Sequence, residues 1–273
     1  METPTLRPVG TLLQRSNLSE DQNLVEQIHE LIRHLIVTVQ LLPLQRVSES
    51  EISEALGASR TPVREAMIRL TNDGLVKVVP KSGTYVTPIN IDRYFEAAYM
   101  RILVEVGVAG RAARRWNAEY EASGVLSKPF SALEEALANK DYFNFARSDE
   151  EFHFNMFGVA GVPGLWNSIK HGQPDLSRVR HLKRVFKIRR SERVVDEHRA
   201  IAEAIYARSE EGAEKAMQAH LGTYEDEAKK LSESPMLVDY ITKINEPSER
   251  NARTFAANAE FAREMKEHLA FTF

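Results

Sequence analysis

Apolar positions in the first part of the chain follow a helical period that is broken at defined points. Between residues 21 and 41, apolar side chains recur at helical spacing, which predicts a helix that Pro43 ends. A second, shorter helix is predicted over residues 49–56. Ser48 can cap its first turn, and Gly57 suits a helix end or a tight turn.

The pattern then changes from a helical period to a strand period. A third helix is predicted to open at Ser59 or Thr61, with its apolar residues on one face. Residues 75–79 and 84–86 are runs of β-branched and aromatic residues, and the turn residues at 80–83 between them predict a β-hairpin. Helix, turn, helix and hairpin in this order indicate a winged helix-turn-helix.

These elements divide the chain into four parts. Residues 1–19 are expected to form a loose N-terminal arm, and residues 20–88 the winged helix-turn-helix domain with its small β-hairpin wing. From the linker onward the period is helical, which predicts an all-α antiparallel helix bundle as a sensing domain over 89–241. Residues 242–273 form a C-terminal extension that we expect to be helical. The fold class is therefore mainly α.

Composition and charge narrow the function classes. The chain has 273 residues, no cysteine and a net charge of −3. The absence of cysteine excludes disulfides and thiolate metal sites. The longest apolar stretch is interrupted by polar residues and proline and is too short to span a bilayer, so we expect a cytoplasmic protein without membrane contact. The acidic net charge leaves room for DNA binding only through a local basic surface.

The third helix and the hairpin supply such a surface. A recognition helix contacts bases in the major groove from its N-terminal turns, and arginine there can bond guanine through two hydrogen bonds. Lysines of the hairpin can contact flanking phosphates. The candidates for DNA contact are polar or basic residues of these two elements: Ser59, Arg60, Thr61, Arg64, Arg69, Lys77 and Lys81.

A second constellation lies in the C-terminal half. Asp149 and His153 are four residues apart on a predicted helix, so their side chains point the same way. His198 and His220 each lie eleven residues from the expected turn at Ser209, so an antiparallel hairpin places them at one height. Three imidazoles and one carboxylate predict a site for a divalent transition metal, zinc first, with nickel or manganese as alternatives. The remaining histidines lack such support and are interpreted as structural or surface residues: His29, His34, His171, His181 and His268.

The segment from Val47 to Ala66, followed by Leu70 and Gly74-Leu75-Val76, resembles the GntR family of bacterial regulators. The resemblance covers about residues 24–88. It implies DNA contacts from Arg60, Thr61, Arg64 and the wing glycine, Gly83. Two departures are present: Gln40 and Pro43-Leu44 stand where the family has glycine and Pro-Gly, and Ser50 replaces a basic residue of some members.

The C-terminal half resembles the FCD sensor domain of the FadR-type branch of that family. The resemblance rests on Glu197-His198-Arg199-Ala200-Ile201, on the stretch 216–221 and on the pair Arg101 and Glu105, and it covers about residues 92–241. It implies a metal held by the same aspartate and three histidines, a carboxylate or sugar-acid effector beside the metal, and a homodimer. Arg101 and Glu105 are the effector-binding candidates, joined by Arg178 or Arg180 if one of these turns inward.

Two functions follow from these patterns. The preferred one is a transcription regulator, a repressor, that binds operator DNA and responds to a small organic acid. The alternative is a metal-dependent hydrolase on a helical bundle, with Glu150 or Glu151 as general base. Neighbouring residues place both glutamates away from the metal face, and no nucleophile motif or phosphate loop is present. The regulator is therefore favoured and no enzymatic activity is expected.

Overall fold

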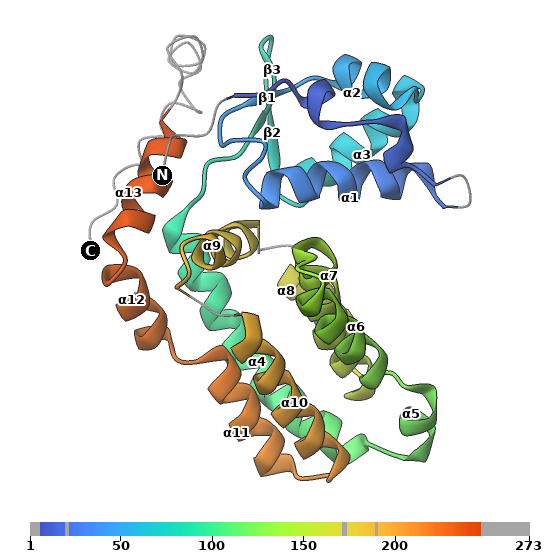
Figure 1. Cartoon of the computed structure of the whole chain (residues 1–273), viewed down its shortest axis with the longest axis vertical. Coiled ribbons are helices and arrows are strands. Elements are labelled where there is room, and N and C mark those ends of the chain that lie inside the picture. The colour runs from blue at the N-terminus through green and yellow to red at the C-terminus, as the bar shows by residue number, and fades with distance from the viewer. Residues whose placement is uncertain (1–5, 20–21, 171–173, 189–190, 247–273) are drawn as a thin grey trace. The chain divides into compact units, whose positions relative to one another are not determined.

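The computed structural model describes residues 6–19, 22–170, 174–188 and 191–246, and these fall into two compact units (Figure 1). Unit 1 comprises Met1–Tyr94, His171–Leu182 and Ser234–Phe273, and unit 2 comprises Phe95–Lys170 and Lys183–Glu233. The fold is mainly helical, with one small sheet. The prediction of the fold class is thus confirmed.

The three helices predicted for the N-terminal domain are present in unit 1. They are α1 (Leu24–Val37), α2 (Glu49–Leu56) and α3 (Arg60–Asn72). The Ser48 hydroxyl accepts a hydrogen bond from the backbone N–H of Glu51, as its capping position predicts. α1 is shorter than predicted because the chain leaves the helical region after Thr38, its C-cap residue.

The wing is a three-stranded antiparallel sheet with strand order β1-β3-β2. The predicted hairpin corresponds to β2 (Val76–Val79) and β3 (Gly83–Val86). β1 (Arg46–Val47) pairs with β3 and was not predicted. A strand of two residues is too short to show an alternating pattern, so the sequence carries no signal for it.

The N-terminal arm is packed rather than loose. It contains two short 3₁₀ turns, η1 (Val9–Leu12) and η2 (Arg15–Asn17). Val9 and Leu13 are buried in the core shared by α1, α2 and α3. The expectation of a loose arm was wrong for these residues, because two apolar side chains in a short segment suffice to anchor it but give no helical or strand period.

Two segments distant in sequence complete unit 1. α9 (Pro174–Val185) contributes its residues up to Leu182, and α13 (Pro235–Asn245) lies wholly in this unit. The sequence had assigned α9 and residues 235–241 of α13 to the sensing domain, and the rest of α13 to the C-terminal extension. The C-terminal extension expected to be helical lies outside the described residues from residue 247 onward.

Unit 2 is helical throughout its described residues. The long helix α4 (Ile91–Arg115) enters it at Phe95. The other helices of this unit are α5 (Ala118–Ser123), α6 (Ser127–Ala138), α7 (Tyr142–Val159), α8 (Pro163–Lys170), α10 (Ser191–Tyr206), α11 (Glu210–Leu221) and α12 (Tyr224–Ser232). α10 and α11 form an antiparallel pair joined by a short turn, as Figure 1 shows.

The core of unit 2 lies among α4, α7, α10 and α11. Phe152 and Met156 of α7 pack there with Ile201 of α10 and Met217 of α11. Packing in this core fixes the positions of these helices along one another. It therefore determines which of their polar side chains come into contact. No helix in the described part of the chain is long and apolar enough to cross a membrane.

Candidate DNA-binding surface and metal centre

α3 has one buried face and one polar face. Val63, Ala66, Met67 and Leu70 are buried against α1, α2 and the sheet. The residues predicted to contact DNA lie on the exposed side: Ser59, Arg60, Thr61, Arg64 and Arg69. The apolar face fixes α3 to its neighbours, which leaves its N-terminal turns and their arginines exposed to solvent.

The wing adds a second exposed basic position. Lys81 is exposed in the turn between β2 and β3 and has a positive φ of 61°. Lys77 lies on β2 and is half-buried. Gly83 has a φ of 137°, a conformation that favours glycine. A Cβ on Gly83 would stand 2.9 Å from Nε of Arg46, so the glycine also makes room for that side chain.

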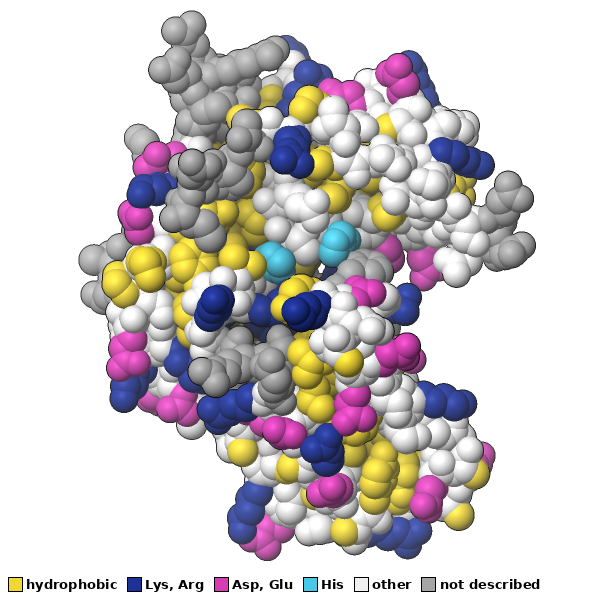
Figure 2. Space-filling model, viewed as in Figure 1, with side chains coloured by type: hydrophobic (Ala, Val, Ile, Leu, Met, Phe, Trp, Pro, Cys, Tyr) yellow, Lys and Arg dark blue, Asp and Glu magenta, His cyan; other side chains and the backbone are white. Residues whose placement is uncertain are grey.

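Basic residues do not form one broad patch on the face shown in Figure 2. On the face in Figure 2, Lys and Arg side chains are interspersed with Asp and Glu, as the net charge of −3 leads one to expect. A DNA-binding role therefore depends on the local set on α3 and the wing rather than on a general positive field.

The second site lies inside unit 2. Asp149, His153, His198 and His220 each offer one ligand atom, and these atoms all lie within 4.8 Å of one another. Asp149 and His153 come from α7, His198 from α10 and His220 from α11. All four side chains are buried. The i,i+4 pair and the mirror placement about Ser209 thus meet as predicted, with 4.6 Å between the ring centroids of His198 and His220.

Two histidines of this cluster, His198 and His220, are held through hydrogen bonds at Nδ1, whereas Nδ1 of His153 makes a close contact that lacks hydrogen-bond geometry. Nδ1 of His198 lies 2.8 Å from the carbonyl oxygen of Val194, and Nδ1 of His220 lies 2.9 Å from Oε2 of Glu197. Nδ1 of His153 lies 2.6 Å from Oε2 of Glu105. A proton on Nδ1 leaves Nε2 of a neutral imidazole as the ligand atom, and such partners also fix the ring orientation.

The chemistry and spacing of the cluster fit a divalent transition metal. Two ligand atoms each about 2.1 Å from one ion lie at most about 4.2 Å apart. The observed limit of 4.8 Å is close to that separation. Nε2 of His153 is fully buried and has no hydrogen-bond partner among the described residues. Burying such an atom is costly, and a bound cation would satisfy it.

Arg101 and Glu105 form a buried ion pair beside this cluster. Nε and Nη2 of Arg101 both donate to the Glu105 carboxylate, and Glu105 also contacts His153. Burial alone would raise the pKa of Glu105, but the charge of Arg101 and the contact with His153 lower it from 4.5 to about 2. Glu105 is therefore ionised at neutral pH. The sequence assigned Glu105 to effector binding and gave no signal for its contact with His153.

The structure does not bring Arg178 to this cluster. Its guanidinium is buried in unit 1, where it donates to the backbone oxygens of Thr87 and Pro88 and to the Asp175 carboxylate. These contacts occupy the donors that an acidic effector would need. Arg180 is half-buried on the same helix. The expected inward turn of Arg178 occurs, but toward the linker after the wing.

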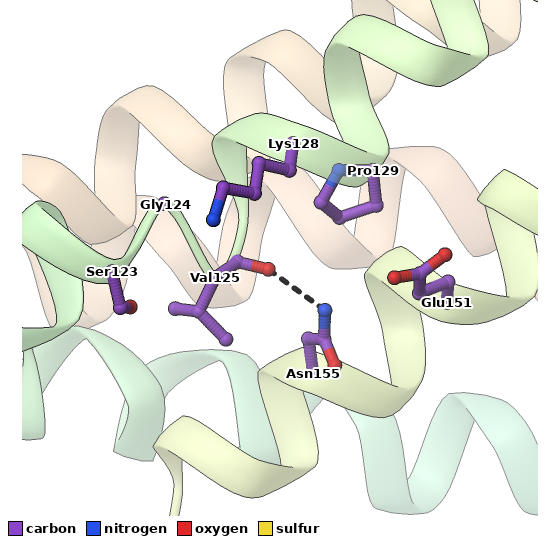
Figure 3. Close-up of a pocket in the computed structure, with 7 residues that line it drawn as sticks. All are labelled: Ser123, Gly124, Val125, Lys128, Pro129, Glu151 and Asn155. Carbon is purple, nitrogen blue, oxygen red and sulfur yellow. Dashed lines mark hydrogen bonds between the residues drawn. The ribbon is translucent and has the colours of Figure 1, made fainter.

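Glu151 lies at a separate surface hollow of about 270 Å³ in unit 2 (Figure 3). Lys128 and Asn155 also line it, and the Asn155 amide donates to the carbonyl oxygen of Val125. Glu151 is exposed, whereas the metal-site residues are buried. This placement agrees with the expectation that Glu151 faces away from the metal ligands.

The remaining histidines that the structure describes lie outside the candidate metal site, as expected for structural or surface residues. His29 of α1 pairs with Asp73 at the end of α3, with 2.6 Å between Nε2 and Oδ2. His34 and His181 are half-buried on α1 and α9. His171 and His268 lie outside the described residues.

A winged helix-turn-helix in one chain with a helical unit that buries a cluster of candidate metal ligands is the architecture of a DNA-binding transcription regulator. Residues 24–86 match the bacterial regulatory proteins of the gntR family, and residues 96–223 match the FCD domain. The chain belongs to the GntR family, in the FadR-type branch that carries an FCD domain. It is a regulator and not an enzyme, which removes the hydrolase alternative.

Individual relatives agree with this assignment. The HTH-type transcriptional repressor RspR of Escherichia coli K12 is 29% identical over 208 residues, which cover 76% of this chain and 89% of that protein. A regulator from the TAR-I ttuE-ttuC' intergenic region of Agrobacterium vitis is 33% identical over 144 residues, which cover 50% of this chain and 80% of that protein.

A solved structure shares the fold. E. coli McbR/YncC superposes with a TM-score of 0.63 at 19% identity, covering 78% of this chain and 99% of that chain. At this level of identity the likeness concerns the fold alone. It supports a winged-helix unit and a helical unit in one polypeptide.

Proposed function

We propose that this regulator is a repressor whose helical unit holds a divalent transition metal and responds to a small carboxylate or sugar acid. The observation that carries the proposal is the convergence of Asp149, His153, His198 and His220 in one buried site. The nitrogen and oxygen donors suit zinc first, with nickel or manganese as alternatives. A bound ion would supply open positions for carboxylate or hydroxyl oxygens of the effector.

Arg101 is the effector-binding residue of this proposal. Glu105 engages Nε and Nη2 of its guanidinium, and the group has further N–H donors for a second carboxylate. Glu105 binds Arg101 and contacts His153 at once, so it joins the anion-binding group to a metal ligand. An acidic effector at Arg101 would therefore act on the same side chains that orient the metal site.

The DNA-binding residues of the proposal are those on the exposed face of α3 and in the wing. Arg60, Thr61 and Arg64 contact base edges and phosphates, with Ser59, Arg69, Lys81 and Gly83 at the margins of the interface. The protein acts as a homodimer, because two recognition helices fit half-sites on one face of the duplex. The effector favours one arrangement of the two heads and so changes operator affinity. The relative RspR is named a repressor, which supports the sign of regulation.

Two measurements test this function. Elemental analysis should find about one metal ion per chain in the wild type and a large loss in His153→Ala. His181→Asn, a change at a histidine outside the cluster, should leave metal content unchanged. Equal metal content in wild type and His153→Ala would overturn the metal site.

The second measurement is a gel-shift assay with the DNA upstream of the protein's own gene. Wild type should retard a specific segment, and sugar acids should weaken that complex. Arg101→Met should bind the same segment but lose the response to the acids. Failure of wild type to retard any segment specifically would contradict operator binding at this locus.

A further inference from the structure

We propose that two arginines outside the recognition helix, Arg15 of the N-terminal arm and Arg46 of β1, contact operator phosphates. They would extend the DNA-binding surface beyond α3. This inference rests on the proposed operator binding. It arises from two local contacts that the sequence pattern did not indicate, one at the turn between α2 and α3 and one at the wing.

Arg15 is attached to the turn of the helix-turn-helix. Its Nη1 donates to the carbonyl oxygen of Leu56, the last residue of α2, at 3.2 Å. Gly57, with a φ of 59°, follows, and a Cβ there would lie 3.9 Å from Cδ of Arg15. Gly57 is three residues before Arg60, a reach of at most about 11 Å along the chain. The arm thus positions the Arg15 guanidinium near the N-terminus of the recognition helix α3.

The arm is held firmly enough to position that side chain. Val9 and Leu13 are buried in the core of unit 1, and the Gln45 amide donates to the carbonyl oxygen of Arg7 at 2.5 Å. Arg15 itself is exposed. One of its donors binds Leu56, so the remaining N–H groups face solvent and are available to an anion.

Arg46 lies at the wing. β1 pairs Arg46 with Tyr85 of β3, and the guanidinium lies over Gly83 at the start of that strand. The position of a Cβ on Gly83 is 2.9 Å from Nε and 3.6 Å from Nη2 of Arg46, so only glycine lets the side chain lie there without a shift. Arg46 is exposed and has no ion pair with any described residue.

Both arginines have the chemistry of phosphate contacts rather than of base contacts. Phosphate contacts come from arginine and lysine side chains at the edges of an interface and fix the orientation of the protein on the duplex. Each neutralised phosphate releases counterions, so it adds about 0.9 to the slope of log affinity against log salt concentration. The two arginines are therefore expected to strengthen binding on all sequences and to leave base discrimination unchanged.

The test measures affinity by fluorescence anisotropy as a function of KCl concentration. The probes are the upstream segment that wild type retards and an unrelated duplex of equal length. Arg15→Gln and Arg46→Gln should each lower the salt slope by about 0.9 on both probes. Their affinities should fall on both, and the ratio between probes should stay the same. Arg15→Lys and Arg46→Lys, which keep the charge, should retain the wild-type slope.

Two controls separate this inference from operator binding itself. Arg208→Gln removes the same charge from an exposed position of unit 2 and should leave the slope unchanged. Arg64→Gln should lower the ratio between the two probes. If it does so while Arg15→Gln and Arg46→Gln keep the wild-type slope, the phosphate contacts are wrong and operator binding stands. If the slope falls in only one of the two variants, the phosphate contact of that arginine stands and that of the other is wrong. If wild type retards no segment specifically, operator binding and this inference both fail.

Discussion

Unit 1 and unit 2 each bury a cluster of charged and polar side chains, and the two clusters differ in what their atoms contact. In unit 1, Arg178 and Asp175 of α9 and Asn245 of α13 surround the linker after the wing; we call these three residues the linker clamp. In unit 2, Asp149, His153, His198 and His220 converge at one point; we call this proposed metal site the metal cluster. Both are buried, so burial does not separate them.

The hydrogen-bond partners of the side chains distinguish the linker clamp from the metal cluster. In the linker clamp, Arg178 donates to the oxygens of Thr87, Pro88 and Pro174, and Asn245 both donates to and accepts from the backbone of Ile89. Asp175 accepts from the backbone N–H of Asn90. The partners are backbone groups and one carboxylate of the same cluster, so the clamp is complete without a ligand. In the metal cluster, Nδ1 of each histidine lies near an oxygen outside the cluster, while the ligand atoms converge. The metal cluster is therefore a candidate ligand site because potential ligand atoms of four side chains converge, whereas the polar atoms of the clamp are engaged by the backbone and by one another.

The largest expected effect concerns the linker clamp. Arg178→Met would leave the Asp175 carboxylate buried without its counter-charge. It would also remove the hydrogen-bond donor of the linker backbone oxygens. Breaking a buried pair in this way costs about 3–5 kcal/mol. Urea unfolding followed by circular dichroism should show this loss. Arg180→Met, on the same helix and half-buried, is the matched control and should cost far less. A loss below about 1 kcal/mol for Arg178→Met would mean that the clamp is dispensable.

The metal cluster should behave in the opposite way. Zinc added to EDTA-treated protein should stabilise the folded state by about 3 kcal/mol when its free concentration is a hundred times its Kd, because binding favours the native state. His153→Ala should lose this gain, whereas Arg178→Met should keep it, since its cluster needs no ion. Thermal unfolding with and without zinc is the measurement. If zinc stabilised His153→Ala as much as it stabilises wild type, the metal cluster would not be the zinc site and the proposed difference between the two clusters would be wrong.

The sequence predicted the metal cluster because its geometry is local. Asp149 and His153 are fixed by helix periodicity, and the placement of His198 and His220 follows from one turn in an antiparallel hairpin. The exposed arginines of α3 were predictable for the same reason, since Val63, Ala66, Met67 and Leu70 define the opposite face.

The linker clamp was not predictable, because its partners are remote. Ile89 and Asn245 are 156 residues apart, and Arg178 and Thr87 are 91 apart. No period or spacing connects such residues, so α9 was assigned to the sensing domain and Asn245 to the C-terminal extension. The contact of Glu105 with His153 joins α4 to α7 and is equally invisible in the pattern. Sequence periodicity fixes which face a residue occupies but not which distant face it meets.

A smaller effect tests how the metal cluster is supported from outside. Glu197 accepts from Nδ1 of His220 and also pairs with the largely exposed Arg193. Outer partners of metal-binding histidines commonly contribute 10–100-fold in affinity. Glu197→Ala should therefore raise the Kd for zinc by about 10-fold or more in a competition titration. Arg193→Ala removes only the exposed pair and should leave the Kd unchanged. An unaltered Kd in Glu197→Ala would show that its contact does not support the site.

The smallest effect comes from a histidine that has carboxylate partners but no converging ligands. His29 lies between Asp73 and Glu30, and its side chain is 14% exposed. Burial lowers the pKa of His29, but the hydrogen bonds and charges of Asp73 and Glu30 outweigh this and raise it from 6.5 to about 9. A raised pKa means that the protonated form stabilises the fold.

This stabilisation has a defined pH window. It is fully present below pH 6.5, the ordinary pKa of histidine, and it is lost as the pH rises through about 9. Its size is on the order of 1 kcal/mol, because solvent screens a partly exposed pair. Urea midpoints of wild type should therefore fall between pH 6 and pH 10 by more than those of His29→Gln. Parallel curves for the two proteins would show that His29 packs as a neutral side chain.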